Sequence, residues 1–417
     1  EVGLLDDDKA DAIINACNKL LGGEYRDQII VDPIQGGAGT SFNMNVNEVL
    51  ANLANEELGG GLGTYEYVHP NDDVNDGQST NDVIPSAGKI ALIRYFKELK
   101  EALSKLVKAL EDKGVEFDDY IKMGRTQLQD AVPIRLGQEF IAYATGLKRD
   151  LHRLDLAIES LSVLNLGGTA TGTGLNADEH YVKKVVPKLA EITGLEVTQN
   201  PDLIEGTQNL DCFAFASSML KTLSTSLSKM SNDFRLLSSG PKTGIEGITL
   251  PAKQAGSSIM PGKVNPVIPE VVNQVAFFVI GNDLTVAMAV EAGQLELNAF
   301  EPIIFHMMFE SLKALNGAIE TLRVNCVEGI TADKEKLKRE VENSIGIVTA
   351  LAPHIGYEKS SMIAKESLKT GKPVRELVLE KKLMDEEDLS RILNLYAMTK
   401  PGIVAEDLLE KEKLHKH

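Results

Sequence analysis

The spacing of apolar residues predicts helices along most of the chain. Leu99, Leu103, Leu106 and Leu110 recur at intervals of three and four residues, and this pattern ends near Gly114. The same spacing predicts helices over residues 1–21, 140–161 and about 209–237. Convincing alternation of apolar and polar residues is scarce, and residues 28–31 give the best short strand signal. The pattern therefore predicts a mainly α protein.

The segment from Pro266 to Val290 is apolar on nearly all sides of its predicted helix. Such a helix must be surrounded, either inside a bundle or by partner chains. Pro302 is expected to kink or break the helix that follows. After about residue 335, shorter helices separated by proline and glycine predict a small C-terminal domain.

Composition and charge narrow the possible partners. Of 417 residues, 43 are Lys or Arg and 61 are Asp or Glu, so the formal charge of −18 argues against nucleic acid or an anionic membrane as a partner. The most apolar run, residues 275–280, is short and has polar flanks, so no membrane span is predicted. An anionic substrate must be attracted by a local basic or N–H-rich pocket.

The three cysteines and the histidines indicate neither a disulfide framework nor a metal site. Cys17, Cys212 and Cys326 are far apart in the sequence and form no CxxC pair, which predicts free thiols and a cytoplasmic location. No two histidines stand at the spacing of metal ligands, so no metal is expected.

The most informative segment is the run GSSIMPGKVNP from Gly256 to Pro266. It places two hydroxyls, an ammonium and a carboxamide on one loop, and its glycines allow close approach to a ligand. Asn265 and Pro266 are predicted as the N-cap and first position of a helix, whose free N–H groups favour an anion. An anion site with an ionisable serine suggests proton abstraction beside a carboxylate. The alternative is a structural turn before a core helix.

Four other segments concentrate small polar residues. They are GGAGTS at 36–41 with the following asparagines, HPND to QSTND at 69–82, MGRTQLQD at 123–130 and GGTATGTGLN at 167–176. Each also has a structural explanation, because Thr40 or Ser79 could be an N-cap and Gly167 a C-cap. The last segment has no lysine after it and no strand before it, which makes nucleotide binding a poor interpretation.

The loop and the four segments resemble, in order and spacing along the whole chain, the active-site regions of the fumarase/aspartase superfamily. The resemblance implies a three-domain subunit with a central bundle of long helices that assembles into a homotetramer, with active sites shared by three subunits. The implied domain limits are 1–79, 80–335 and 336–417. Family members carry a few dozen residues before the position of Glu1, so the first domain is expected to be incomplete.

Within the superfamily the chain resembles aspartases most and class II fumarases next. The implied substrate is L-aspartate, which is converted reversibly to fumarate and ammonia without a cofactor, through an enediolate intermediate. Activation by a divalent cation, as in some relatives, cannot be read from the sequence. The resemblance makes Ser257 the base, and its loop must make this hydroxyl unusually acidic. The implied substrate-binding residues are Thr40, Ser79, Thr80 and Ser258 for one carboxylate and Thr126, Lys263 and Asn265 for the other.

Gln127 favours the ammonia-lyase over the hydratase. Fumarases carry histidine at this position, as some aspartases also do, whereas other aspartases carry glutamine. In a hydratase a titratable group here can protonate a departing hydroxide. A glutamine carbonyl beside Asn81 can accept a hydrogen bond from the substrate ammonium. Glu270 would pair with that histidine in fumarases, so we place it in a supporting position only. Fumarate hydratase and a truncated or inactive homologue with a structural role remain alternatives.

Overall fold

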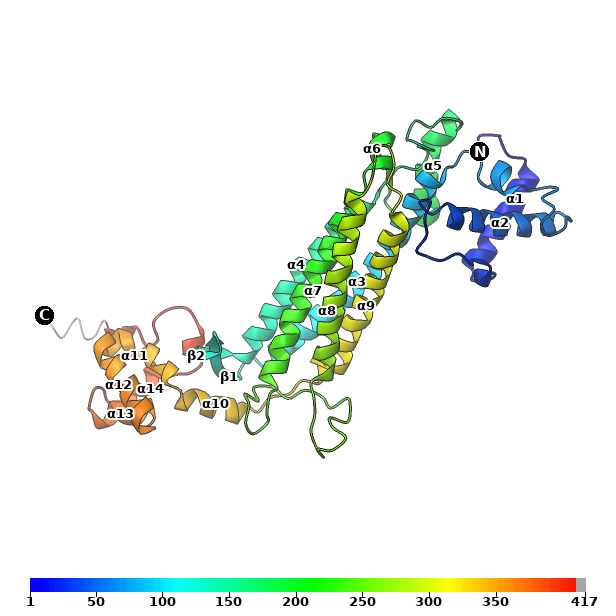
Figure 1. Ribbon diagram of the computed structural model, residues 1–417. Helices are drawn as coiled ribbons and strands as arrows, with labels where there is room; N and C mark the ends of the chain where they lie inside the picture. The colour runs from blue at the N-terminus through cyan, green and yellow to red at the C-terminus, as the bar shows by residue number, and fades with distance from the viewer. Residues whose placement is uncertain (410–417) are drawn as a thin grey trace. The chain divides into compact units, whose positions relative to one another are not determined.

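The computed structural model describes residues 1–409 and consists mainly of helices (Figure 1). The helices are α1 Asp7–Leu21, α2 Thr40–Glu57, α3 Thr80–Glu116, α4 Leu136–Leu161, α5 Glu179–Thr193, α6 Leu203–Gln208, α7 Asp211–Leu237, α8 Val267–Glu291, α9 Glu301–Asn325, α10 Lys334–Asn343, α11 Val348–Ile355, α12 Tyr357–Thr370, α13 Val374–Glu380 and α14 Glu386–Ile392. The strands are β1 Ile121–Thr126, β2 Gln129–Arg135, β3 Val163–Leu164 and β4 Thr198–Gln199. Strands β1 and β2 pair antiparallel, and β3 and β4 pair parallel.

The chain forms two compact units. The first comprises Glu1–Leu103, Arg149–Leu227 and Asn273–Ala318, and the second comprises Ser104–Lys148, Ser228–Val272 and the chain from Ile319 onward. Helices α3, α4, α7, α8 and α9 each contribute residues to both units. The division into domains 1–79, 80–335 and 336–417 stays a prediction, and residues 410–417 of the last one lie outside the described part of the chain.

Close contacts between long helices hold the first unit together (Figure 1). A Cβ atom at Gly88 of α3 would lie 2.1 Å from the ring of Phe305 on α9, so only glycine permits this contact. The ring of Phe305 in turn meets Phe213 of α7 edge-on, with centroids 5.2 Å apart. Asn282 of α8 donates a 3.0 Å hydrogen bond to Ser311 of α9. The predicted bundle is therefore built around aromatic and small residues.

The second unit contains the β1–β2 hairpin and the C-terminal helices. Ile121 and Met123 of β1 join a buried cluster with Leu351, Leu377 and Val378 from helices α11 and α13. Position 124 of β1 requires glycine, because a Cβ atom there would come within 2.7 Å of the Val132 carbonyl oxygen. The hairpin is thus fixed to the helices that follow residue 335.

The fold confirms the long predicted helices and corrects three shorter expectations. Residues 28–31 form no strand, and residues Arg26–Gln28 are a 3₁₀ turn. The first helix begins at Asp7, after Asp6, and not at residue 1. Pro302 does not break a helix, because it is the second residue of α9, where a missing backbone N–H has no helical acceptor to lose.

Glu301, the first residue of α9, is a carboxyl group buried without a hydrogen-bond partner. Glu301 is 1% exposed, and neither of its carboxyl oxygens has a hydrogen-bond partner among residues 1–409. Burial raises the pKa of Glu301 to about 8, although the nearby Lys89 ammonium acts in the opposite direction. At neutral pH this carboxyl group is therefore protonated in the folded chain.

Replacing Glu301 by glutamine should stabilise the protein by an amount that grows as the pH rises from about 4.5 to about 8. The folded pKa lies above the ordinary value of 4.5, so the native state is fully favoured below about pH 4.5 and loses stability as the pH rises through about 8. Thermal unfolding should show Glu301→Gln and wild type equal in acid. The difference in free energy of unfolding should open above about pH 4.5 and reach a constant value on the order of 5 kcal/mol above pH 8.

Glu310→Gln on the exposed side of the same helix is the matched control, and it should follow the wild type at every pH. A constant difference between Glu301→Gln and the wild type from pH 5 to pH 9 would contradict the assignment of a neutral Glu301.

Candidate functional site

The start of α2 brings Thr40 to a turn of the first unit. The N-cap Gly39 adopts a left-handed conformation with φ of 89°, which glycine permits at little cost. The backbone N–H and the hydroxyl of Thr40 both donate to the Gly37 carbonyl, at 3.0 and 2.8 Å. Thr40 is therefore the first helical residue rather than the N-cap. Its hydroxyl is exposed at the end of the helix, where N–H groups favour an anion.

Buried asparagines connect this helix to the segment before α3. Asn43 donates to Asn75 Oδ1 at 3.1 Å and to Thr80 Oγ1 at 3.3 Å, and Asn47 donates to the same Asn75 oxygen at 2.9 Å. The Asn75 amide then donates to the Gln78 carbonyl at 3.1 Å. The network holds the residues before α3 against α2, and it brings the segments of Thr40 and Thr80 together.

Ser79 caps α3 through a reciprocal arrangement. Its Oγ accepts a 3.2 Å hydrogen bond from the Asn81 N–H, while Asp82 Oδ1 accepts a 2.9 Å bond from the Ser79 N–H. The Oγ1 of Thr80 accepts a bond from Asn43. The protein thus uses both hydroxyls as acceptors, which leaves each hydroxyl hydrogen able to donate to a carboxylate.

Asn81 joins α3 to the glycine-rich segment 167–176. Its Nδ2 donates to the Ala170 carbonyl at 2.8 Å, and its own backbone carbonyl accepts from Asn165 Nδ2 at 3.0 Å. Because the amide nitrogen is engaged, the Oδ1 oxygen is the atom that remains for a ligand. That orientation suits an acceptor for an ammonium group.

Gln127 lies at the tip of the β1–β2 hairpin in the second unit. The two residues of its turn, Gln127 and Leu128, have φ of 53° and 63°, an uncommon conformation for side chains of this size. Thr126 pairs with Gln129 at the base of this turn. The hairpin therefore presents Thr126 and Gln127 as adjacent exposed polar residues.

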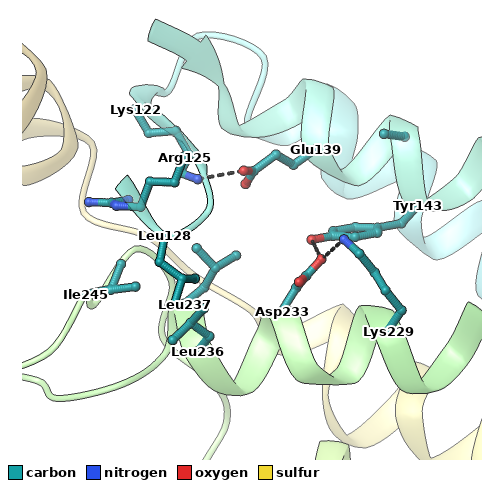
Figure 2. A pocket seen from close by; sticks show the side chains of 11 residues that line it. Lys122, Arg125, Leu128, Glu139, Tyr143, Lys229, Asp233, Leu236, Leu237 and Ile245 are labelled. Atoms are coloured by element: carbon teal, nitrogen blue, oxygen red, sulfur yellow. Dashed lines mark hydrogen bonds and ion pairs between the residues drawn. The ribbon is translucent and has the colours of Figure 1, made fainter. Parts of the chain in front are cut away.

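A cavity of about 270 Å³ lies beside this hairpin and is lined by charged residues of β1, α4 and α7 (Figure 2). The buried Lys122 forms a 2.7 Å ion pair with Glu139. Across the cavity, the hydroxyl of Tyr143 donates to Asp233 at 2.8 Å, and Lys229 also pairs with Asp233. Burial and the Asp233 charge raise the pKa of Tyr143 far above its usual value. These groups are paired among themselves, with the Lys122–Glu139 pair connecting β1 to α4 and the Asp233 bonds connecting α7 to α4.

The loop 256–265 is closed on itself by its two ends. Asn265 Nδ2 donates to the Gly256 carbonyl at 2.6 Å. A Cβ atom at Gly256 would lie 1.8 Å from the Lys263 carbonyl oxygen, so no other residue fits there. The sequence predicted Asn265 as the N-cap of the next helix, but α8 begins at Val267 and the Asn265 side chain closes the loop instead.

Two backbone N–H groups point at the Ser257 hydroxyl oxygen. Ser257 Oγ accepts bonds from the Ile259 N–H at 3.2 Å and the Met260 N–H at 3.0 Å. Such donors stabilise a negative charge on that oxygen more than on a neutral hydroxyl. Ser258 and Lys263 are exposed on the same loop, and Ile259 is 83% exposed. The loop can therefore hold a serine as a base at its surface.

The predicted residues form two groups, one in each unit. Thr40, Ser79, Thr80 and Asn81 are held together in the first unit by the asparagine network and the α3 cap. The second unit contains Thr126, Gln127, the loop residues Ser257, Ser258, Lys263 and Asn265, and Glu270 in the first turn of α8. Within the described residues 1–409, no hydrogen bond connects Thr126 or Gln127 to the loop.

Two supporting residues were missed from the sequence. Asp82 and Asn165 are fully buried and hold the site segments by side-chain bonds to the backbone. For Asp82 a signal existed, because Ser79 followed by an acidic residue three positions later is a capping-box pattern. Asn165 had no such signal. Among residues 1–409, no group of three His, Cys, Asp or Glu side chains is placed to hold a metal ion.

Comparison with known proteins places these features in a family. Residues 1–281 match the family described as Lyase, and residues 347–400 match the one described as Fumarase C C-terminus. The aspartate ammonia-lyase of Pseudomonas aeruginosa is 54% identical over 405 residues, which are 97% of this chain and 85% of that protein. The aspartate ammonia-lyase of Bacillus subtilis is 49% identical over 96% of this chain and 84% of its own length.

Solved structures of similar fold support the same family assignment. A fumarate lyase:delta crystallin from Brucella melitensis, bound to cobalt, has a TM-score of 0.93 and 48% identity, covering 95% of this chain and 86% of that chain. The recombinant class II fumarase from Schistosoma mansoni has a TM-score of 0.90 at 34% identity, covering 96% of this chain and 87% of that chain. The predicted resemblance is confirmed, and the chain belongs to the fumarase/aspartase superfamily of lyases.

Proposed function

We propose that this chain is an aspartate ammonia-lyase, a carbon–nitrogen lyase that converts L-aspartate reversibly to fumarate and ammonia. Curated relatives of that name from three bacterial genera, with 49–54% identity over 96–97% of the chain, support this proposal. The main structural observation in favour of this chemistry concerns Ser257. Its hydroxyl oxygen accepts hydrogen bonds from two backbone N–H groups of the closed loop.

Ser257, as the alkoxide, would remove a proton from the carbon next to the side-chain carboxylate of aspartate and would become the neutral hydroxyl. That carboxylate then takes up charge as an enediolate, and hydroxyl donors can strengthen their hydrogen bonds as the charge develops. Thr40, Ser79, Thr80 and Ser258 would donate to it. Thr126, Lys263 and Asn265 would bind the other carboxylate. The hydroxyl oxygens of Ser79 and Thr80 accept hydrogen bonds from the protein, which leaves both hydroxyl hydrogens for the substrate. This supports their assignment to the carboxylate that becomes the enediolate.

Release of ammonia requires acceptors rather than an acid. The substrate ammonium can donate to Gln127 Oε1 and to Asn81 Oδ1, whose amide nitrogen is occupied by the Ala170 carbonyl. The likeness to a class II fumarase supports fumarate hydratase as the second candidate, with malate as substrate. Glutamine cannot protonate a departing hydroxide, so Gln127 favours the ammonia-lyase.

We further propose that the chain works as a homotetramer, with sites completed by residues of more than one copy. Among the described helices, α8 alone has the length and apolar composition of a membrane span, and 39% of its most apolar stretch is buried. Phe277, Leu284 and Met288 are each more than 60% exposed on it. Its buried Asp283 accepts from Ser217 at 2.8 Å, so the polar face of α8 is turned to the protein. An exposed apolar face of this extent on α8 supports the proposal that other copies of the chain cover it.

A cytoplasmic location is also proposed. Cys17, Cys212 and Cys326 are free thiols, and burial raises the pKa of Cys326 to about 12. Unpaired thiols of this kind are typical of a reducing compartment.

The substrate assignment predicts that the protein forms fumarate from L-aspartate and not from L-malate. The measurement is ultraviolet absorbance of the product double bond, run on both substrates with one preparation. Ser257→Ala serves as the blank for contaminating activity. Fumarate from malate alone would move the protein to the hydratases and make the interpretation of Gln127 wrong.

Removal of the base should reduce turnover far more than binding. Ser257→Ala is expected to lower kcat by about 10²–10⁴-fold, the usual contribution of a general base, with KM nearly unchanged. Ser238→Ala is a suitable control, because that hydroxyl bonds only within the end of α7. If Ser257→Ala keeps a tenth or more of wild-type kcat, Ser257 is not the base.

Assembly should depend on the exposed face of α8. Leu284→Glu, at a position 64% exposed in a single chain, should reduce the tetramer to smaller species in light scattering and abolish turnover. Leu368→Glu on α12, at a position 69% exposed, is the matched control and should change neither. A wild-type protein that is monomeric and fully active would contradict the tetramer proposal.

A further inference from the structure

Asp82 is a buried carboxylate with three backbone hydrogen bonds. It is 0% exposed and lies in the first turn of α3. Oδ1 accepts from the Ser79 N–H at 2.9 Å, and Oδ2 accepts from the Gly167 and Thr169 N–H groups, both at 3.0 Å. Burial raises the pKa of this carboxyl group, while the three N–H bonds act in the opposite direction. A neutral acceptor would suffice for capping alone, so a buried carboxyl group here calls for a further explanation.

The two oxygens of Asp82 hold two segments that the sequence analysis singled out separately. One oxygen holds the cap of α3, where Ser79, Thr80 and Asn81 follow one another. The other holds the turn at 167–169, where both Gly167 and Thr169 have positive φ, of 97° and 52°. Threonine rarely adopts that conformation, so the turn needs an external restraint. Convergent N–H groups in such a turn form a concave site for an anion, and Asp82 fills it.

A second pair of contacts runs parallel to the Asp82 bonds. Asn81 Nδ2 donates to the Ala170 carbonyl, and Asn165 Nδ2 donates to the Asn81 carbonyl at 3.0 Å and to Thr207 at 3.1 Å. Asn81 is thus fixed on both its side chain and its backbone, directly beside Asp82. The side-chain oxygen of Asn81 and the hydroxyls of Ser79 and Thr80 consequently have one defined orientation.

We propose that Asp82 is a positioning residue, which orients Ser79, Thr80 and Asn81 by locking the start of α3 to the glycine-rich turn 167–169. Asp82 itself does not touch the substrate in this arrangement, because its oxygens are occupied by backbone N–H groups. The proposal rests on the assigned binding role of Ser79, Thr80 and Asn81. A positioning role for Asp82 requires only that the substrate has a carboxylate, so the proposal applies whether the substrate is aspartate or malate.

The test replaces Asp82 by asparagine, which keeps the shape but has one acceptor oxygen instead of two. The variant must lose either the Ser79 bond or the bonds to the turn, and its NH₂ group then faces an N–H donor. With the substrate that the wild type converts, we expect kcat to fall about 100-fold and KM to rise only a few-fold. The affinity for fumarate, measured by calorimetry, should weaken about tenfold.

The matched control is Asp178→Asn, which alters a helix cap of the same unit. Asp178 Oδ1 accepts from the His180 and Tyr181 N–H groups at 2.8 and 3.1 Å, and both of these bonds lie within the first turn of α5. Asparagine caps a helix about as well as aspartate, so Asp178→Asn should leave the thermal midpoint, kcat per folded molecule and fumarate affinity close to those of the wild type. If Asp82→Asn lowers only the thermal midpoint and leaves kcat per folded molecule and fumarate affinity unchanged, its role is only structural and the proposal is overturned.

A second variant covers the case in which Asp82→Asn does not fold. Asn165→Ala removes the parallel bond to the Asn81 carbonyl without placing a new polar group in the interior. It should lower kcat about tenfold and weaken fumarate binding several-fold. Unchanged kcat and fumarate affinity would overturn the proposal. Wild-type protein that binds fumarate but does not convert aspartate would instead contradict the ammonia-lyase assignment alone.

Discussion

Unsatisfied N–H groups at the starts of helices are the constraint around which the polar segments of this chain are arranged. Three of its polar segments lie immediately before α2, α3 and α8, and every one of these helices must find acceptors for its first N–H groups. The chain provides some from its own side chains and carbonyls, as Ser79 does for α3. The remaining donors would favour the dianionic substrate that we propose, in a protein whose formal charge is −18.

The same donors explain why hydroxyl and amide residues are concentrated around these helix starts. A permanent cation would bind substrate and transition state almost equally, whereas hydroxyl and N–H donors respond to charge as it develops. Their weakness is that they are directional, so each must be oriented by a further bond. Asn43 orients Thr80, and Asn265 closes the loop that presents Ser257.

The long helices could be predicted from the sequence, and candidate site segments could be named, but the contacts that connect these segments could not be predicted. Helical periodicity is a local signal, and the loop sequence around Ser257 is distinctive. The hairpin at residues 121–135 was missed because Gly124 and Pro133 interrupt the alternation that identifies a strand. Asn265 was assigned to a cap because its competing acceptor, the Gly256 carbonyl, lies nine residues earlier. Asp82 bonds across 85 and 87 residues, a distance at which no sequence pattern is informative.

The neutral carboxyl of Glu301 has a thermochemical consequence. With a pKa of about 8 in the folded chain and an ordinary pKa in the unfolded one, this group takes up nearly one proton per chain when the protein folds at neutral pH. Unfolding therefore delivers that proton to the buffer. The calorimetric enthalpy of unfolding should include the buffer's heat of protonation, and it should differ between phosphate and an amine buffer at the same pH.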